Sequence, residues 1–312
     1  MGSYIYHSLS HEDSQAAIEH FERAISLDPN FALAHCALGG VYANRVIKGS
    51  GDKDDYARAT ASFTRALALD AHLIEARMHM VFIYLARGEK SEARARSGAS
   101  QSRGPERSRR ALCERYAASF DGEYPEALRE FELMLRLNPA ERVVVSYNRA
   151  RIFLYQRRYD DALLELSHGA ASSPDHPLVK TFQAFVLYFM GEIDRAAEIL
   201  REVLARQPKL HGIRPILAMC LSAQGRHEEA RRELDERVKA NAEVDHDVAY
   251  WLASAYAVEG ERGEAIHWLG RAIELGNENR TWFESDPNWA ALRSDPGFQD
   301  LMRRIAANRV SG

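Results

Sequence analysis

Small and bulky apolar residues recur along this chain at spacings of three and four, which places them on one face of a helix. One kind of helix has a small residue, a bulky one four positions later and usually a small one three after that. Its members are Ala17, Phe21, Ala24; Ala59, Phe63, Ala66; Ala127, Phe131, Met134; Ala196, Leu200, Val203; and Ala265, Leu269, Ala272. A second kind has a small residue and then a large one three positions later, as in Gly39 and Tyr42, Ala184 and Leu187, Ala218 and Leu221, Ala253 and Tyr256. The pattern predicts packed helix pairs along the chain.

Stops similar to Leu-Asp-Pro divide these pairs at a nearly constant period. They fall at Pro29, Ala71, Pro105, Pro139, Pro174, Pro208 and Ala242, so the intervals are 42, 34, 34, 35, 34 and 34 residues. The longer first interval, which spans the second repeat, comes mostly from residues 45–55, where Gly49, Ser50 and Gly51 indicate a flexible loop. A fixed period of this length predicts one extended stack in which each unit contacts its neighbours.

The combined pattern resembles the tetratricopeptide repeat, W-x2-L-G-x2-Y followed by A-x3-F and Pro, over about residues 4–275. The resemblance implies an all-α fold, a right-handed α-solenoid of about eight helix-turn-helix repeats with a concave groove that binds proteins or peptides. We expect the array over residues 1–281, with repeats ending near 29, 71, 105, 139, 174, 208, 242 and 276. The array is also similar to the C-terminal repeat regions of bacterial multi-domain signalling regulators.

The last part of the chain is not a repeat. Asp-Pro steps at Pro287 and Pro296 predict two helices, about 287–292 and 296–307, each capped by the preceding carboxylate. We expect residues 282–307 to form a C-terminal cap and residues 308–312 a disordered tail. The apolar residues expected to cover the last repeat are Trp282, Phe283, Trp289, Phe298, Leu301 and Ile305.

Two segments depart from the repeat pattern. The first repeat has no polar cap before it: either the array is the C-terminal part of a longer chain, or a partner covers its first helix. This uncapped first repeat could also mediate self-association. Residues 97–118 keep the repeat length but carry polar, Gly- and Arg-rich sequence, so they are either a divergent repeat or an artefact of compensating reading-frame errors.

Composition narrows the classes of partner. The net charge is −4, and the arginines between Arg94 and Arg115 have few aromatic residues among them, so we expect no nucleic-acid binding. The most apolar run, 182–190, is too short to span a bilayer, and no signal segment precedes the array. Three widely separated cysteines suggest reduced thiols. A cytoplasmic protein with no membrane contact is the expectation.

The sequence contains none of the common catalytic motifs. Phosphate loops, dinucleotide fingerprints, kinase motifs, nucleophile elbows and zinc-protease motifs are absent from the sequence. We therefore expect a non-enzymatic protein with no catalytic residues, no metal site and no cofactor.

The resemblance implies that the first helix of each repeat lines the groove. The residues that this assigns to a peptide-binding groove are Tyr147, Asn148, Arg151, Tyr155, Thr181, Phe185, Tyr188, Phe189, Tyr250 and Trp251. Two interpretations of Phe185, Tyr188 and Phe189 stay open, an exposed aromatic site or a tightly packed core. The lysines and asparagines with which some family members clamp a C-terminal carboxylate are not reproduced. Cys36, Gly40, Met78 and Phe82 stand at those positions, so an apolar or aromatic-rich segment is the expected ligand.

The sequence thus predicts an interaction scaffold whose concave face binds a peptide or protein segment. The alternative is the regulatory or sensory C-terminal region of a bacterial Ser/Thr kinase or winged-helix transcription regulator, separated from its effector domain. The sequence does not name the partner or the oligomeric state.

Overall fold

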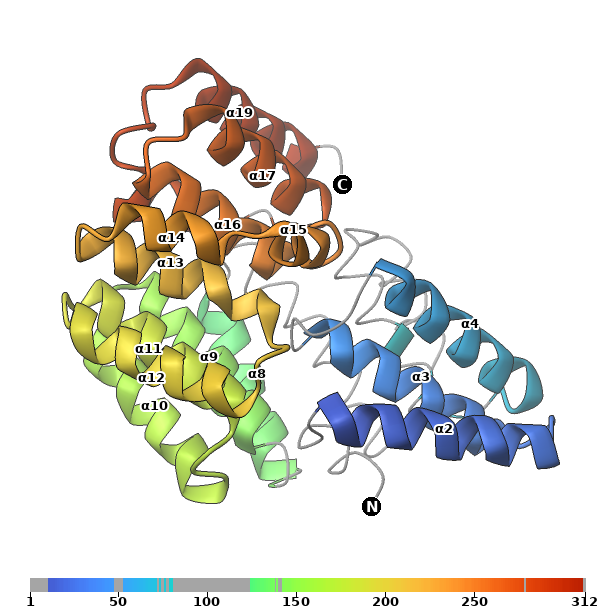
Figure 1. The fold of residues 1–312 in the computed structure, drawn as a ribbon. Coiled ribbons are helices and arrows are strands. Elements are labelled where there is room, and N and C mark those ends of the chain that lie inside the picture. The colour runs from blue at the N-terminus through green and yellow to red at the C-terminus, as the bar shows by residue number, and fades with distance from the viewer. Residues whose placement is uncertain are drawn as a thin grey trace.

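A computed structural model of the chain describes residues 11–47, 53–71, 73, 76, 79–80, 124–137, 139, 142–277 and 279–310. Within these ranges the regular structure is entirely helical (Figure 1). The helices are α2 (His11–Leu27), α3 (Ala32–Ile47), α4 (Lys53–Leu69), α8 (Tyr124–Leu137), α9 (Arg142–Tyr155), α10 (Tyr159–Ser172), α11 (Pro177–Phe189), α12 (Ile193–Arg206), η2 (His211–Ile213), α13 (Arg214–Ala223), α14 (His227–Glu233), α15 (Glu236–Ala242), α16 (His246–Val258), α17 (Arg262–Glu274), α18 (Arg280–Ser285), η3 (Pro287–Trp289) and α19 (Pro296–Val310).

Consecutive helices pair as the period predicts, α9 with α10, α11 with α12, α13 with α14, and α16 with α17. Three of the joints turn at a glycine with positive φ: Gly191, Gly225 and Gly260, at +84°, +75° and +76°. The next residue donates its backbone N–H to the carbonyl five positions earlier, as Glu192 does to Leu187, which satisfies an otherwise free carbonyl at the helix end. The pairs stack into an α-solenoid, coloured green to red in Figure 1.

The joint between α9 and α10 has the same hydrogen bonds without a glycine. Arg157 adopts φ +58° there, and Arg158 donates to the carbonyl of Phe153. A side chain in this left-handed region costs about 1–2 kcal/mol because its Cβ crowds the following carbonyl.

The second helix of the seventh repeat is divided. α14 ends at Glu233, and α15 begins after Asp235, whose carboxylate accepts from the backbone N–H groups of Arg237 and Val238. The periodic sequence gives no sign of this break, because the apolar spacing continues through it.

One continuous core runs through α9 to α19. The small and large residues at the predicted positions, among them Ala184, Leu187, Ala196 and Leu200, are buried in it. Since small residues lie where helices cross and large ones fill the space beside them, the packing follows the sequence pattern directly.

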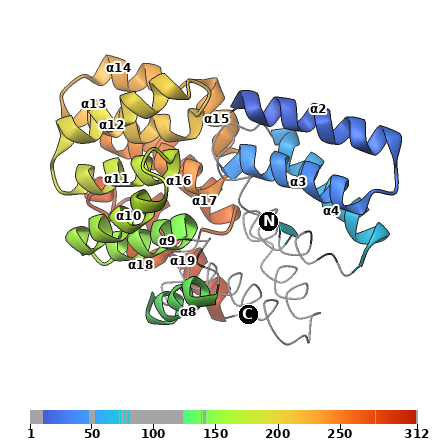
Figure 2. The ribbon, with the colours of Figure 1, turned by 90° about the horizontal axis from the view of Figure 1, so that it is seen from below.

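A second core joins α2, α3 and α4, which lie apart from α8–α19 in Figures 1 and 2. Gly39 brings α3 close to α4: a Cβ added to it would lie 2.8 Å from the ring of Phe63. Val244, just after α15, packs against the core of this block and so connects it to the rest of the described chain.

The predictions for residues 1–10 and for residues 97–118 lie outside the described residues. At the other end, α19 continues to Val310, beyond the predicted end at 307, so residues 308–310 of the predicted tail are helical.

Candidate functional site

All ten residues assigned to the groove lie on three helices that face one another, α9, α11 and α16. Tyr147 on α9 meets Phe182 of α11 edge-on, with ring centroids 4.8 Å apart, and Phe185 of α11 lies 6.0 Å from Trp251 of α16. Phe185, Phe189 and Tyr188 form a run of edge contacts at 5.0 and 5.2 Å along α11. We call the surface formed by α9, α11, α13 and α16 the inner face.

The inner face is covered by the chain's own residues 279–289, here called the docked segment, which comprise α18 and η3. Seven of the ten predicted residues are buried: Tyr147, Asn148, Arg151, Thr181, Phe185, Tyr250 and Trp251. The other three, Tyr155, Tyr188 and Phe189, are half-buried and pack against the core.

The docked segment contacts α9 through one indole and one carbonyl. The Trp282 ring lies 5.1 Å from Tyr155, and the guanidinium of Arg157, just beyond α9, donates to the carbonyl of Ser285. On the adjoining α8, the hydroxyl of Tyr124 donates to Asn279 Oδ1 at 3.0 Å. These contacts join residues 127 to 155 positions apart in the sequence.

The docked segment contacts α11 and α13 through the same indole and one amide. Trp282 lies 5.4 Å from Phe189, and Tyr188 donates its hydroxyl to Asn288 Oδ1 at 2.8 Å. The amide of Asn288 points its nitrogen at the sulfur of Met219 on α13, 3.5 Å away. Asn288 thus links two neighbouring repeats.

Tyr250 of α16 holds the centre of the docked segment. Its ring stacks on Phe283 at 4.9 Å and lies 6.5 Å from Trp289, while its hydroxyl donates to Asp286 Oδ2 at 2.5 Å. Asp286 also caps η3 by accepting from the backbone N–H of Asn288 at 2.9 Å. The carboxylate therefore fixes both the shape of the segment and its place on the inner face.

Burial dominates the electrostatics of this contact. It raises the pKa of Asp286 to about 6, although the hydrogen bonds from Tyr250 and Asn288 and the charges of Arg293 and Arg157 act in the opposite direction. The pKa values of Tyr250 and Tyr188 are also raised, first by burial and then by the nearby Asp286 carboxylate. Both hydroxyls therefore remain protonated donors at neutral pH.

A second polar cluster connects α9 directly to the start of α16. Arg151 lies 3.3 Å from Asp247 Oδ2 and donates to Asn148 Oδ1 at 2.9 Å, and Tyr147 donates to Asp247 at 3.5 Å. Burial acts to raise the pKa of Asp247, but the charges of His246 and Arg151 and the hydrogen bonds outweigh it and hold that pKa below its usual value. Arg151 thus binds an internal carboxylate, while Asn148 accepts from Arg151 and donates to the carbonyl of Val144.

The predicted cap divides into two parts with different positions. Phe298, Leu301 and Ile305 of α19 are buried, and α19 packs on α17, where a Cβ on Gly270 would lie 3.7 Å from Leu301. Phe283 stacks on Tyr250 in the last repeat, whereas Trp282 packs on Tyr155 and Phe189 of earlier repeats. Both aromatic residues are buried, and the contact of Trp282 with the earlier repeats is the part that the sequence did not predict.

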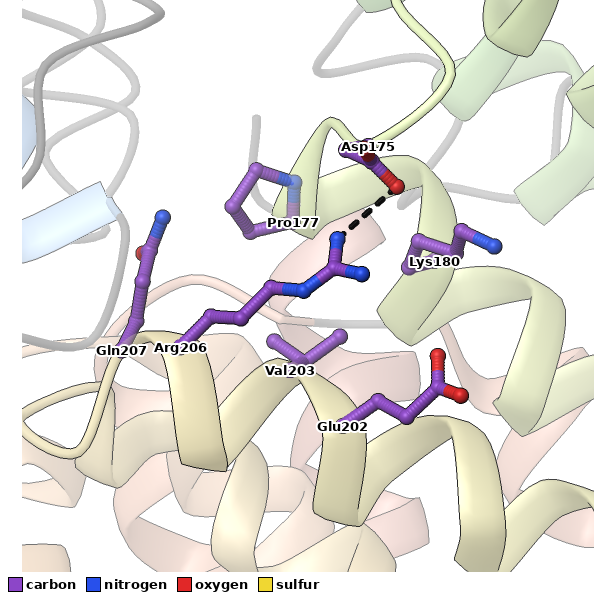
Figure 3. A pocket seen from close by; sticks show the side chains of 7 residues that line it. All are labelled: Asp175, Pro177, Lys180, Glu202, Val203, Arg206 and Gln207. Atoms are coloured by element: carbon purple, nitrogen blue, oxygen red, sulfur yellow. Dashed lines mark ion pairs between the residues drawn. The ribbon is translucent and has the colours of Figure 1, made fainter.

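A shallow pocket lies elsewhere, between the start of α11 and the end of α12 (Figure 3). Its lining residues are Asp175, Pro177, Lys180, Glu202, Val203, Arg206 and Gln207. An ion pair of 2.9 Å between Arg206 and Asp175 crosses it. None of the predicted groove residues lines this pocket, and its exposed ion pair contributes little to any specific binding.

Ser222, His227 and Glu259 are the residue types of a hydrolase triad, but their hydrogen bonds are not those of one. Ser222 donates to Glu259 at 2.6 Å, and His227 Nδ1 lies 2.8 Å from the same carboxylate oxygen. A nucleophilic serine must instead donate to the histidine that removes its proton. The cluster joins the seventh and eighth repeats.

In the described part of the chain no group of three or more His, Cys, Asp or Glu side chains is arranged to hold a metal ion, and no helix has the length and apolarity of a membrane span.

The repeats belong to a known class. Residues 12–45 match the TPR repeat family, and residues 190–246 match the tetratricopeptide repeat family. The chain is a tetratricopeptide repeat protein with an α-solenoid fold, as the sequence predicts, and this class provides scaffolds for protein–protein interaction. Both matches are to repeat families rather than catalytic ones. The similarity to bacterial signalling regulators stays a prediction.

Several known proteins are similar. Superkiller protein 3 of Schizosaccharomyces pombe is 26% identical over 219 residues, which are 67% of this chain and 15% of that protein. The structure of the human IFIT1 dimer with m7Gppp-AAAA has a TM-score of 0.59 at 12% identity and covers 85% of this chain and 68% of its own. A tetratricopeptide repeat protein from Parabacteroides merdae has a TM-score of 0.48 at 15% identity, covering 85% and 99%. The likeness to IFIT1 concerns the fold alone.

Proposed function

We propose that this protein is a non-enzymatic scaffold whose inner face binds a segment of another protein. The residues that would make the contact are the aromatic ones of α11 and α16, with Arg151, Asn148 and Tyr155 of α9 beside them. The observation that carries the proposal is that this face already holds a short helical segment through three aromatic side chains and a carboxylate.

The side chains of the inner face suit a short peptide segment better than they suit the flat surface of a folded partner. Tyrosine and tryptophan give large contact areas with few rotatable bonds, and their polar ends fix orientation. Tyr188 and Tyr250 each use the ring for packing and the hydroxyl for a side-chain acceptor on the segment. A partner with matching aromatic and acceptor groups would find both kinds of contact in place.

A capture experiment tests this proposal. The intact protein is compared with a variant carrying Tyr188→Ala and Phe189→Ala, and with a control carrying Leu164→Ala, an exposed residue of α10. Circular dichroism checks that all three are equally helical. The proposal expects a partner that the intact protein and the control retain and the double variant loses. Equal capture by all three proteins, or capture by none, contradicts it.

A further inference from the structure

The docked segment is joined at both ends to elements that pack on each other, α17 and α19. Upstream, α17 ends at Glu274 and the chain turns at Gly276, with φ +98°. Downstream, Asp295 caps α19 by accepting from the backbone N–H of Gly297 at 2.7 Å, and it pairs with Arg262 of α17. α19 contacts α17 as well as the segment, where the rings of Trp289 and Phe298 lie 5.4 Å apart. Release of residues 279–289 as a loop would therefore break the contact with Trp289 but leave the packing of α19 on α17 in place.

The contact between the segment and the inner face leaves several buried polar atoms without a hydrogen-bond partner among the described residues. They are the indole nitrogens of Trp282 and Trp289 and the amide nitrogen of Asn279. Buried indole N–H groups ordinarily find an acceptor, and each group that does not weakens the state that buries it. The segment is therefore held less firmly than its aromatic content alone would suggest.

The backbone of the receiving surface is strained at the same contact. Arg157 has positive φ at the position where the following repeats have Gly191, Gly225 and Gly260. Its guanidinium donates to the carbonyl of Ser285 in the docked segment. A non-glycine residue kept in this conformation at one repeat, where it reaches the segment, marks a specific contact rather than general packing.

We propose that the docked segment is a tethered competitor, which occupies the inner face until a partner segment of the same chemistry displaces it. This rests on the inner-face function proposed above and adds its regulation and the kind of ligand. The partner presents two adjacent aromatic side chains, then an acidic side chain at the start of a tight turn, in the manner of Trp282, Phe283 and Asp286. Its aromatic groups replace those of the segment against Tyr155, Phe189 and Tyr250, and its carboxylate accepts from the Tyr250 hydroxyl.

The test uses the segment itself as the probe. A fluorescently labelled peptide with the sequence of residues 279–289 is titrated, with anisotropy as the readout, into the intact protein and into Trp282→Ala, which alters the tether but not the inner face. Glu284→Ala is the matched control, because Glu284 lies in the same segment but is exposed and pairs with the neighbouring Arg280. The proposal expects binding to Trp282→Ala at least tenfold tighter than to the intact protein and the control, and none by a peptide of scrambled order.

If Trp282→Ala does not fold, hydrogen exchange of the intact protein tests whether the docked segment opens separately from the core. Amides of residues 279–289 should exchange at least tenfold faster than those in the middle of α16 and α17, because the segment opens without global unfolding. Exchange as slow as that of α16 makes the segment part of the core and overturns the proposal, as does equal peptide binding by folded Trp282→Ala and intact protein. Dimers of Trp282→Ala formed by exchange of the segment would also overturn it, assigning the face to a second copy. Partner capture that depends on Tyr188 and Phe189 would survive any of these results, so the two proposals fail separately.

Discussion

The hydroxyl of Tyr250 donates a 2.5 Å hydrogen bond to the fully buried carboxylate of Asp286, and in this way the last repeat binds the segment that follows it. Tyr250 was expected to face a ligand. It does face an acidic, aromatic segment, one that belongs to the same chain.

The raised pKa of Asp286 predicts a pH dependence with a definite sign. Burial raises this pKa from 3.8 to about 6, so the folded state binds the proton more tightly than the unfolded chain does. The resulting stability is fully present below about pH 4 and is lost as the pH rises through about 6. Asp286→Asn lacks this titration but keeps an acceptor for Tyr250.

Urea unfolding of the intact protein and of Asp286→Asn between pH 4 and pH 7 measures the effect. The stability of the intact protein relative to the variant should fall by about 2 kcal/mol over this range. Asp245, also buried with a raised pKa, and Asp247 titrate in both proteins and cancel in the difference. A difference that does not change with pH would mean that the carboxylate is solvated and the segment undocked.

Removing only the hydroxyl of Tyr250 tests the hydrogen bond itself. Tyr250→Phe keeps the ring stacked on Phe283 but removes the donor to Oδ2 of the buried Asp286 carboxylate, whose Oδ1 still accepts from Asn288. We expect the free energy of unfolding at pH 7 to fall by about 1–3 kcal/mol. Tyr256→Phe, at a half-buried position of the same helix, is the control and should change it by less than about 0.5 kcal/mol.

The ion pair between Arg151 and Asp247 should be strongly coupled, because both side chains are largely removed from water, at 1% and 15% exposed. Replacing either one by Ala leaves the other charge buried, which costs about 3–5 kcal/mol. Replacing both should cost less than the sum, and a double-mutant cycle measures the difference. The exposed pair of Arg232 and Glu228, treated in the same way, should show a coupling of no more than about 0.5 kcal/mol. Equal couplings for the two pairs would contradict the buried geometry.

The close approach of α3 and α4 makes Gly39 intolerant of a side chain. Gly39→Ala places a methyl group 2.8 Å from the Phe63 ring, and we expect it to lower stability by about 1–3 kcal/mol. Gly263→Ala is the matched substitution on α17, where nothing lies within 4 Å of the added carbon. It should be neutral or stabilise by up to about 1 kcal/mol. Thermal unfolding compares the two, and a stabilising Gly39→Ala would refute the helix packing.

The repeat period could predict the fold because it records contacts between neighbours. Ala196 and Leu200, or Gly39 and Tyr42, have their spacing only because each pair must pack locally, so the pattern identifies the helices and their order. The Asp-Pro steps at Asp286 and Asp295 likewise predicted caps that lie within two or three residues of their donors.

The position of the docked segment could not be predicted in this way. The contacts of Asn279 with Tyr124, Trp282 with Phe189 and Asn288 with Tyr188 join residues about a hundred or more positions apart, across the curve of the stack. That curvature depends on small rotations at each joint, which the spacing of apolar residues does not encode. For the same reason the sequence did not predict that residues 279–289 cover the surface to which the groove residues were assigned.

Photocrosslinking from Phe189 tests most directly whether the chain occupies its own inner face. Phe189 is replaced by a photoreactive phenylalanine analogue, the purified protein is irradiated at low concentration, and tryptic peptides are identified by mass spectrometry. The account predicts an intramolecular crosslink to the peptide of residues 281–293, which contains Trp282, whose ring lies 5.4 Å from Phe189. Crosslinks that bypass this peptide and join Phe189 only to other parts of the chain would contradict the docked segment.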